Sequence, residues 1–243
     1  MSEDKDRLFA KNRALTSGFR FDERVVKVFP DMIARSVPGY ELVVPMIGLL
    51  ARRYAQPDSN IYDLGCSLGA ASLAMSLAVR ASGTRIIAVD NSEAMVSRCR
   101  KNLVDKGGTV PIDIHLKDIL DTQIENSSVV VLNFTLQFLE RDQRQSLINR
   151  ISAGMRAGGV LIISEKICFE DEREQIDQTA WHHDFKRAQG YSDLEISQKR
   201  NALEDVLLPE TEASHFKRLQ QAGFSRYHRW FQCFSFVSYI AFK

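Results

Sequence analysis

The stretch IYDLGCSLGAASLAM, residues 61–75, decides the fold class of this chain. A short apolar run typical of a buried strand leads into a turn bracketed by Gly65 and Gly69, and an alanine-rich segment with helical spacing follows. Such a turn lets backbone amides approach a ligand closely, because glycine has no side chain. The same letters also satisfy G-x-S-x-G, the nucleophile elbow of α/β-hydrolases. Ser67 is therefore either a nucleophile or part of a binding loop.

Strand-like and helix-like segments alternate through the middle of the chain. Strands are expected at 60–65, 84–90, 111–118, 127–134 and 160–166, and helices at 70–81, 91–108 and 141–159. Asn91 or Ser92 is the expected N-cap of the second helix, and Gly107 and Gly108 are its expected stop. This alternation predicts a mostly parallel sheet with helices on both faces.

Two helical additions and a closing hairpin complete the predicted α/β architecture. Residues 22–56 form a helical segment before the first strand, and residues 167–210 form a polar helical insertion. A further helix over 215–224 precedes two alternating strands within 227–243. Both additions are placed to cover a site at the carboxyl edge of the sheet. We expect a single domain over residues 1–243.

Composition excludes several classes of protein. The 243 residues carry a net charge of +1, which gives the whole chain no electrostatic reason to bind nucleic acid. The four cysteines are scattered without a CxxC pair, so neither a disulfide framework nor a zinc site is expected. The charged N-terminus has no apolar core of a signal peptide, and the apolar C-terminal run is too short to cross a bilayer. These features predict a cytoplasmic protein without a membrane partner.

Polar residues at four strand ends favour the binding-loop interpretation of Ser67. A hydrolase elbow normally follows a middle strand, whereas this motif follows the first one. The second strand ends in Asp90, which suits hydrogen bonding to ribose hydroxyls. Asp118 follows the third strand and is placed for an adenine amino group, and Asn133 ends the fourth near the reacting end of a ligand.

The spacing of the loop also selects the ligand class. NAD sites favour G-x-G-x-x-G, whereas this chain has D-x-G-x-x-x-G with Asp63 just before the turn. This pattern resembles the motif of class I S-adenosyl-L-methionine-dependent enzymes. The resemblance implies a Rossmann-like methyltransferase fold, with a seven-stranded sheet and an antiparallel C-terminal hairpin. A carboxylate at Asp63 suits a cationic ligand and repels a pyrophosphate.

Longer stretches of the sequence narrow the resemblance from this broad class of enzymes to one family. The segments VFPDMIARSVPGY, YDLGCSLGAA, VVLNFTLQFL, HHDFKRAQGYSDLEISQKR and WFQCF together resemble the carboxy-S-adenosyl-L-methionine synthase family, from about Phe21 to Lys243. The resemblance implies that S-adenosyl-L-methionine and prephenate become carboxy-S-adenosyl-L-methionine, phenylpyruvate and water. It further implies no metal, a homodimer, and a functional link to a tRNA carboxymethyltransferase that modifies the wobble uridine. Direct binding of nucleic acid is not expected.

The resemblance also assigns site residues. Arg200, in SQKR, is expected to bind the added carboxylate and to act in catalysis. The positions matched to cofactor contacts are Tyr40, Gly65, Cys66, Ser67, Asp90, Asn91, Asp118, Ile119, Asn133 and Arg200.

Other interpretations stay open from sequence alone. A conventional methyltransferase acting on a small molecule or a tRNA base shares the glycine-loop features. A non-catalytic module that stores or senses the nucleoside shares them as well. His182 and His183 are expected in surface or packing roles, because no zinc-like spacing surrounds them. Lys186-Arg187 and Lys199-Arg200 ordinarily indicate a solvated helix face.

Overall fold

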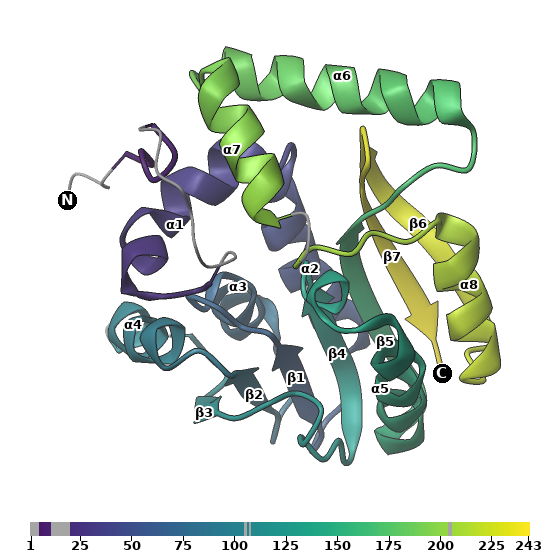
Figure 1. Cartoon of the computed structure of the whole chain (residues 1–243). Coiled ribbons are helices and arrows are strands. Elements are labelled where there is room, and N and C mark those ends of the chain that lie inside the picture. The colour runs from purple at the N-terminus through teal and green to yellow at the C-terminus, as the bar shows by residue number, and fades with distance from the viewer. Residues whose placement is uncertain (1–4, 11–19, 105, 107, 204–205) are drawn as a thin grey trace.

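A computed structural model describes residues 5–10, 20–104, 106, 108–203 and 206–243, and its strands form one seven-stranded sheet (Figure 1). The strand order is β3-β2-β1-β4-β5-β7-β6. Strands β1 to β5 pair in parallel, and β7 runs antiparallel between β5 and β6. The predicted sheet with its closing hairpin is confirmed. The strands are β1 (Asn60–Leu64), β2 (Arg85–Asp90), β3 (Ile112–Leu116), β4 (Ser127–Asn133), β5 (Met155–Lys166), β6 (Arg226–Cys233) and β7 (Phe236–Phe242).

Helices cover both faces of the sheet because the central strands are apolar on both sides. In β4, Val129 and Val131 pack in the same core cluster as residues of α2 and α3, whereas Val130 and Leu132 pack with α5. This alternation follows from the period of two in a strand. The helices are α1 (Glu23–Ser36), α2 (Tyr40–Tyr54), α3 (Ala70–Ala78), α4 (Glu93–Leu103), η1 (Leu136–Phe138), α5 (Arg141–Gly154), α6 (Glu172–Ala188), α7 (Asp193–Leu203) and α8 (Glu212–Gln221).

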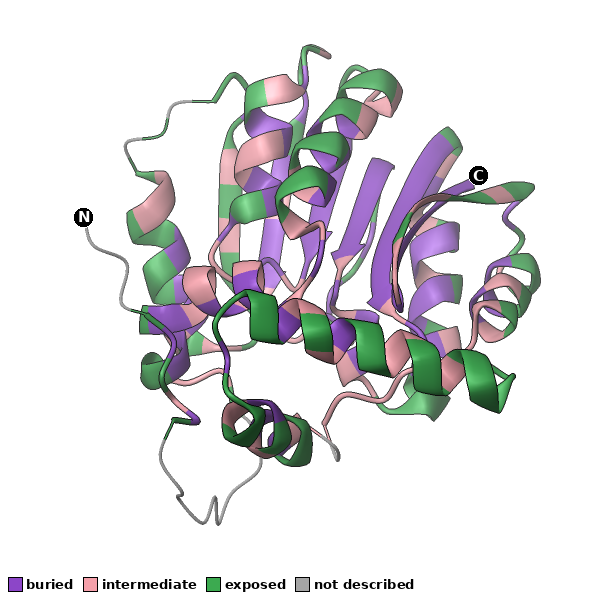
Figure 2. Ribbon diagram, turned by 90° about the horizontal axis from the view of Figure 1, so that it is seen from above, coloured by how far each residue is buried: buried purple, intermediate pink, exposed green. Residues whose placement is uncertain are grey.

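The two helical additions lie where the sequence placed them. Helices α6 and α7 lie across the carboxyl ends of the parallel strands, together with α1 (Figure 1). Seen from above, α6 is mostly exposed on its outer side, and buried residues gather beneath it (Figure 2). The additions therefore cover the carboxyl edge of the sheet, where ligands of such folds bind.

Several predicted helix ends were wrong; the helix expected over 70–81, for example, ends at Ala78. The helix expected over 141–159 ends at Gly154, and β5 begins at Met155, whose backbone is extended. Met155 pairs with Ser127, and a bulge accommodates the following residues. Helix α4 ends at Leu103, and the expected stop at Gly107 lies outside the described residues.

The N-cap of α4 is Ser92, one of the two predicted candidates. Its Oγ accepts a hydrogen bond from the Met95 amide at 3.2 Å. This bond satisfies one of the amides that every helix leaves unpaired in its first turn.

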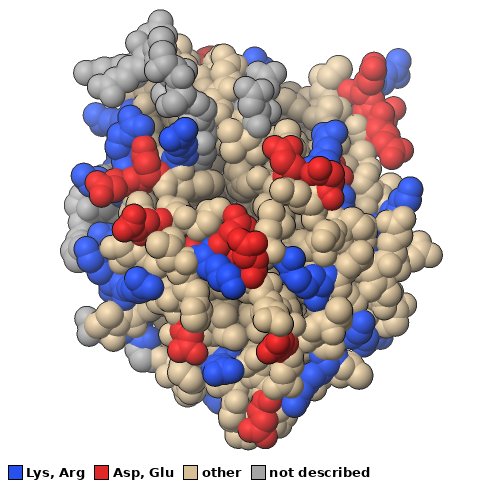
Figure 3. Space-filling view, turned by 60° about the horizontal axis from the view of Figure 1, so that its bottom comes forward, with Lys and Arg blue, Asp and Glu red and all other residues tan. Residues whose placement is uncertain are grey.

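The face away from α6 and α7 carries interspersed basic and acidic side chains (Figure 3). No field of a single sign dominates that view, in keeping with the net charge of +1. Within the described part of the chain, no single helix is long and apolar enough to cross a membrane. Among the helices of the described residues, the bent pair of α1 and α2, at 96° to each other, passes that test together, by length and composition alone.

Candidate active site

A pocket of about 660 Å³ lies at the carboxyl edge of the sheet. Its walls come from the ends of β1, β2, β4 and β5, and from α1, α2, α6 and α7. The structure brings all ten residues that the sequence assigned to this pocket together in its wall. These residues are Tyr40, Gly65, Cys66, Ser67, Asp90, Asn91, Asp118, Ile119, Asn133 and Arg200. Their roles in binding stay predictions.

The turn after β1 has a backbone that favours glycine. Gly65 has φ of +84°, and a Cβ there would lie 2.4 Å from Thr135 Oγ1. Ser67 also has a positive φ, of 49°. Its amide donates to Asp90 Oδ2 at 2.9 Å, and the Ser92 amide donates to Asp90 Oδ1 at 2.9 Å. Asp90 therefore fixes the turn from the neighbouring strand.

The Ser67 hydroxyl lacks the environment of a nucleophile. Its Oγ donates a weak hydrogen bond to Met95 Sδ at 3.5 Å. Among the described residues, no histidine hydrogen-bonds to it, so nothing there removes its proton as a catalytic triad requires. The geometry supports the binding-loop interpretation over the hydrolase.

Two side-chain oxygens in the pocket wall are buried without a partner. Asp63 is 1% exposed, and its Oδ2 accepts from Ser72 Oγ at 2.5 Å, while Oδ1 has no partner. Asn133 Oδ1 is likewise unpaired. Burial, with a smaller contribution from the charge of Asp90, raises the pKa of Asp63 to about 6. Two such acceptors fit a ligand that brings a cationic N–H donor, such as an ammonium group.

The part of the pocket wall that follows β2 and β3 is mixed in polarity. Asn91 Nδ2 donates to Asp118 Oδ2 at 3.4 Å, and Asp118 Oδ1 accepts from the Leu120 amide at 2.8 Å. The neighbouring Ile119 is buried. An apolar surface beside an acceptor suits a purine ring with an exocyclic amine.

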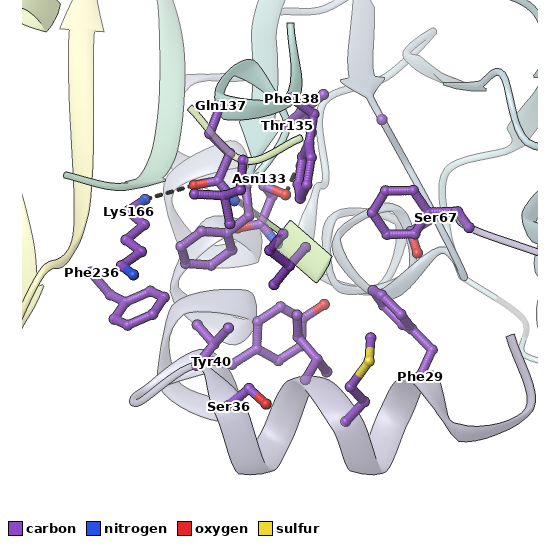
Figure 4. Close-up of a pocket in the computed structure, with 18 of the residues that line it drawn as sticks. Phe29, Ser36, Tyr40, Ser67, Asn133, Thr135, Gln137, Phe138, Lys166 and Phe236 are labelled. Atoms are coloured by element: carbon purple, nitrogen blue, oxygen red, sulfur yellow. Dashed lines mark hydrogen bonds between the residues drawn. The ribbon is translucent and has the colours of Figure 1, made fainter. Parts of the chain in front are cut away.

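Aromatic side chains complete the walls, and apart from Tyr40 the sequence did not single them out. Figure 4 shows Phe29 and Tyr40 on one side of the cavity, Phe138 opposite them, and Phe236 at one end. The Tyr40 and Phe134 rings are 6.3 Å apart. Burial raises the pKa of Tyr40, so its hydroxyl stays protonated and can donate. These rings make this part of the pocket wall apolar.

The end of the pocket formed by α6, α7 and β5 is rich in cations. We call the set Lys166, Lys186, Lys199 and Arg200 the cationic cluster; all four line the pocket. Lys199 Nζ donates to Ser36 Oγ at 2.8 Å and lies 3.7 Å from the Asp6 carboxylate.

The solvated-face interpretation was wrong for Lys186 and Lys199, which are buried, whereas Arg187 and Arg200 are exposed. The spacing of four between His182 and Lys186 places both on the inner side of α6. That periodicity was the signal available in the sequence.

The two adjacent histidines have different surroundings. His182 Nε2 donates to the Ser36 carbonyl at 2.8 Å and is buried, which confirms a packing role. Burial first, and then the charges of Lys186 and Lys166, lower the pKa of His182 to about 3, so the ring is neutral. Within the described ranges, no group of three or more His, Cys, Asp or Glu side chains is placed to hold a metal ion.

The chain is similar in sequence to known proteins that bear on this site. A methyltransferase-domain family model matches residues 61–159. A carboxy-S-adenosyl-L-methionine synthase of Geobacter sp. (strain M21) is 57% identical over 244 residues, covering 100% of both chains. The chain belongs to the carboxy-S-adenosyl-L-methionine synthase family. Another member, from Yersinia enterocolitica, is 55% identical over 98% of this chain and 90% of its own length. Membership in this family makes the chain an enzyme of the transferase type.

Solved structures of low sequence identity share the fold of this synthase-family chain. Human N-acetylserotonin methyltransferase, solved with S-adenosylmethionine, matches with a TM-score of 0.62 and 18% identity. An O-methyltransferase family protein from Burkholderia thailandensis matches with a TM-score of 0.64 and 16% identity. The matches cover 91% and 92% of this chain, but only 55% and 60% of those chains. They confirm the Rossmann-like methyltransferase fold.

Proposed function

We propose that this protein converts S-adenosyl-L-methionine and prephenate into carboxy-S-adenosyl-L-methionine, phenylpyruvate and water. The observation that carries the proposal is the polarity of the pocket. One end presents the unpaired oxygen of Asp63, followed on the neighbouring strand β4 by that of Asn133, and the other end presents the cationic cluster. The first end suits the cationic substrate, and the second suits a carboxylate co-substrate. The names of the full-length relatives support the formation of carboxy-S-adenosyl-L-methionine.

The reaction exchanges a methyl proton for a carboxylate. Prephenate loses carbon dioxide and hydroxide and becomes phenylpyruvate. Hydroxide takes the proton from the sulfonium methyl group and leaves as water, and the methyl carbon bonds to carbon dioxide. Because prephenate supplies the base in this scheme, the enzyme needs no catalytic histidine. The neutral, hydrogen-bonded state of His182 is compatible with that.

The residues of this chain bind, orient and exclude water in the proposed reaction. Asp63 holds the ammonium group, Asp90 accepts from the ribose hydroxyls, and Asp118 accepts from the adenine amine. Arg200 grips the new carboxylate, because a guanidinium forms two parallel hydrogen bonds to it. The aromatic walls keep water from supplying a competing proton.

A conventional methyltransferase is the alternative within the same fold. Its chemistry needs the acidic end of the pocket but gives no reason for four cationic side chains at the other end. The experiment incubates the purified enzyme with S-adenosyl-L-methionine, with and without prephenate, and follows the nucleoside by mass spectrometry. We expect a nucleoside heavier by one carbon dioxide, and one phenylpyruvate per nucleoside, over many turnovers. A methylated acceptor and no carboxylated nucleoside would establish the alternative, and binding without turnover would establish a storage module.

We also propose a cytoplasmic homodimer that passes its product to a tRNA carboxymethyltransferase and does not bind the tRNA. The interspersed charges of Figure 3 support the absence of nucleic-acid binding on that face. An exposed apolar stripe on α2, formed by Leu42, Met46 and Leu49, supports association with a second copy. Sedimentation of the wild type and of Leu42→Asp tests this: a dimer should become a monomer. A wild-type monomer would refute the dimer, and an undisturbed mutant dimer would place its interface elsewhere.

A further inference from the structure

Two lysines in the pocket wall have no anionic partner. Lys166 ends β5, and Lys186 lies on the inner side of α6 with 8% of its surface exposed. In the described part of the chain, no carboxylate oxygen lies within 4.0 Å of either Nζ. Lys199 differs, since the Asp6 carboxylate compensates its charge and Ser36 Oγ accepts a hydrogen bond from it. The first two ammonium groups are therefore uncompensated by the fold.

The uncompensated charges have a cost. Burial, then the neighbouring charges of Lys199 and Lys166, lower the pKa of Lys186 to about 7, and burial lowers the pKa of Lys166. The neighbouring cations repel the charge of Lys186, and burial removes part of the hydration of both ammonium groups. Packing gives no reason to keep them, because an apolar side chain of similar length would fill the same space. A bound anion would remove the cost.

The position of the lysines separates them from the end that suits the nucleoside substrate. Strand β4 lies between β1 and β5, so the ends of β1 and β5 are about 10 Å apart, or two strand spacings. Figure 4 shows Lys166 at one end of the cavity, beside Phe236, and Ser67 at the other. The carboxylate of S-adenosyl-L-methionine is one carbon from its ammonium group. With that group on Asp63, its carboxylate stays near β1 and away from Lys166.

We propose that Lys166 and Lys186 form a subsite for a dicarboxylate co-substrate, in which they position its two carboxylates while Arg200 receives the one that is transferred. This inference rests on the proposed function, in which the co-substrate is prephenate, a dianion. Lys166 lies on the sheet, at the end of β5 (Figure 4), and Lys186 lies on α6 of the helical insertion, so the co-substrate is held between the sheet and the insertion. Such a site favours two negative charges over one and orients the ring relative to the sulfonium methyl group.

The test measures binding without chemistry. Prephenate is titrated calorimetrically into enzyme saturated with S-adenosyl-L-homocysteine, which lacks the methyl group and cannot react. We expect Lys186→Met and Lys166→Met each to weaken prephenate binding at least tenfold. Binding of S-adenosyl-L-methionine should stay within about twofold of wild type. The matched control is Lys217→Met, an exposed lysine of α8 outside the pocket, which should change neither affinity.

Two further measurements separate this subsite from a structural role. Lys186→Arg keeps the charge and should recover part of the lost prephenate affinity. Lys186→Met removes an uncompensated buried charge, so the free enzyme should unfold at an equal or higher temperature. If Lys186→Met misfolds, it will show a lower unfolding temperature and weak binding of both ligands. The prephenate titrations of Lys166→Met and Lys186→Arg then test the subsite in its place.

The outcomes also distinguish the subsite from the proposed function. Lysine variants that bind prephenate as tightly as wild type overturn the subsite, even when the wild-type enzyme carboxylates its nucleoside. If well-folded variants bind prephenate and S-adenosyl-L-methionine more weakly by the same factor, the lysines contact the carboxylate of S-adenosyl-L-methionine. That result overturns the subsite as well. A wild type that neither binds nor consumes prephenate refutes both proposals.

Discussion

The amide of Ser67 donates to Asp90 Oδ2 with 2.9 Å between the two atoms, so the glycine turn after β1 is tied to the end of β2. The other oxygen of the same carboxylate accepts from the Ser92 amide at the start of α4. A carboxylate offers about four acceptor positions, so two remain for ligand hydroxyls in the pocket that Asp90 lines. One side chain thus shapes the loop and meets the ligand. The sequence had suggested only the contact with the ligand, and the geometry leaves acceptor positions for it.

Asp90→Ala should weaken S-adenosyl-L-methionine binding on the order of tenfold to a hundredfold, because charged hydrogen bonds contribute roughly 1.5 to 3 kcal/mol. Calorimetry measures the change. The N-cap bond from Met95 to Ser92 does not involve Asp90, so α4 should persist by circular dichroism. Asp113→Ala, at an exposed position on β3, is the control. Wild-type affinity in Asp90→Ala would remove Asp90 from the binding site.

The sequence predicted the parts of the fold that depend on local pattern. Alternating and continuous apolar runs located the strands, and Gly65 located the turn, because these signals act within a few residues. The end of α5 was missed, since Met155 becomes a strand residue only by pairing with Ser127. That pairing joins residues about 28 positions apart, so a pattern within a few residues does not predict it.

The cationic end of the site could not be predicted from local sequence pattern either. Lys186 reads as a surface residue, and it is buried because α6 lies across the sheet edge against Ser36 and Phe236, both distant in sequence. Arg200 was named from a family resemblance and not from its spacing. The acidic end was easier to predict from the sequence, because each acid lies at or near the carboxyl end of a strand, and parallel strands end at one edge of the sheet.

The pKa of Asp63 predicts a proton linkage. Burial raises this pKa from 3.8 to about 6, so the folded protein binds the proton more tightly than the unfolded chain does. The associated stability is fully present below about pH 3.8 and is lost as the pH rises through about 6. A cationic ligand favours the ionised carboxylate. S-adenosyl-L-methionine should therefore bind more tightly as the pH rises through this range, with release of a proton.

Calorimetry at pH near 6, in buffers of different ionisation enthalpy, measures that proton. Asp63→Asn should bind the ligand more weakly and without proton release. Its unfolding free energy should rise relative to wild type between pH 3.8 and about 6, by up to about 3 kcal/mol for a shift of about two pKa units. Buffer-independent binding by the wild type would show that Asp63 does not contact the cation.

Asp6 predicts a stabilising role for the N-terminal segment, for which the sequence gave no function. Its carboxylate is 1% exposed, accepts from Tyr191 Oη at 2.5 Å and lies 3.7 Å from Lys199 Nζ. Asp6→Ala leaves that ammonium group buried without an anion, which should lower the unfolding free energy by about 3 kcal/mol. Asp6→Asn keeps an acceptor for Tyr191, so its unfolding free energy should lie between those of the wild type and Asp6→Ala.

Urea unfolding at neutral pH checks the effect, with Lys5→Ala as the exposed neighbouring control, expected within about 0.5 kcal/mol of wild type. A destabilisation of Asp6→Ala no larger than that of the control would mean that the contact with Lys199 contributes nothing.

Arg200 should distinguish the carboxylated nucleoside from the ordinary one. A guanidinium grips a carboxylate through two parallel hydrogen bonds, and a methyl group accepts neither. Since Arg200 is exposed, solvent screens the pair, and we expect a preference of about tenfold, or about 1.4 kcal/mol. Arg200→Leu should bind S-adenosyl-L-methionine nearly normally yet lose this preference, and Arg200→Lys should be intermediate because it keeps the charge without the fork. Titration of both nucleosides into each variant measures the preference, with Arg173→Leu, exposed on α6, as the control. Retention of the wild-type preference by Arg200→Leu would place the carboxylate on another cation of the cluster, and the lysine variants would then identify it.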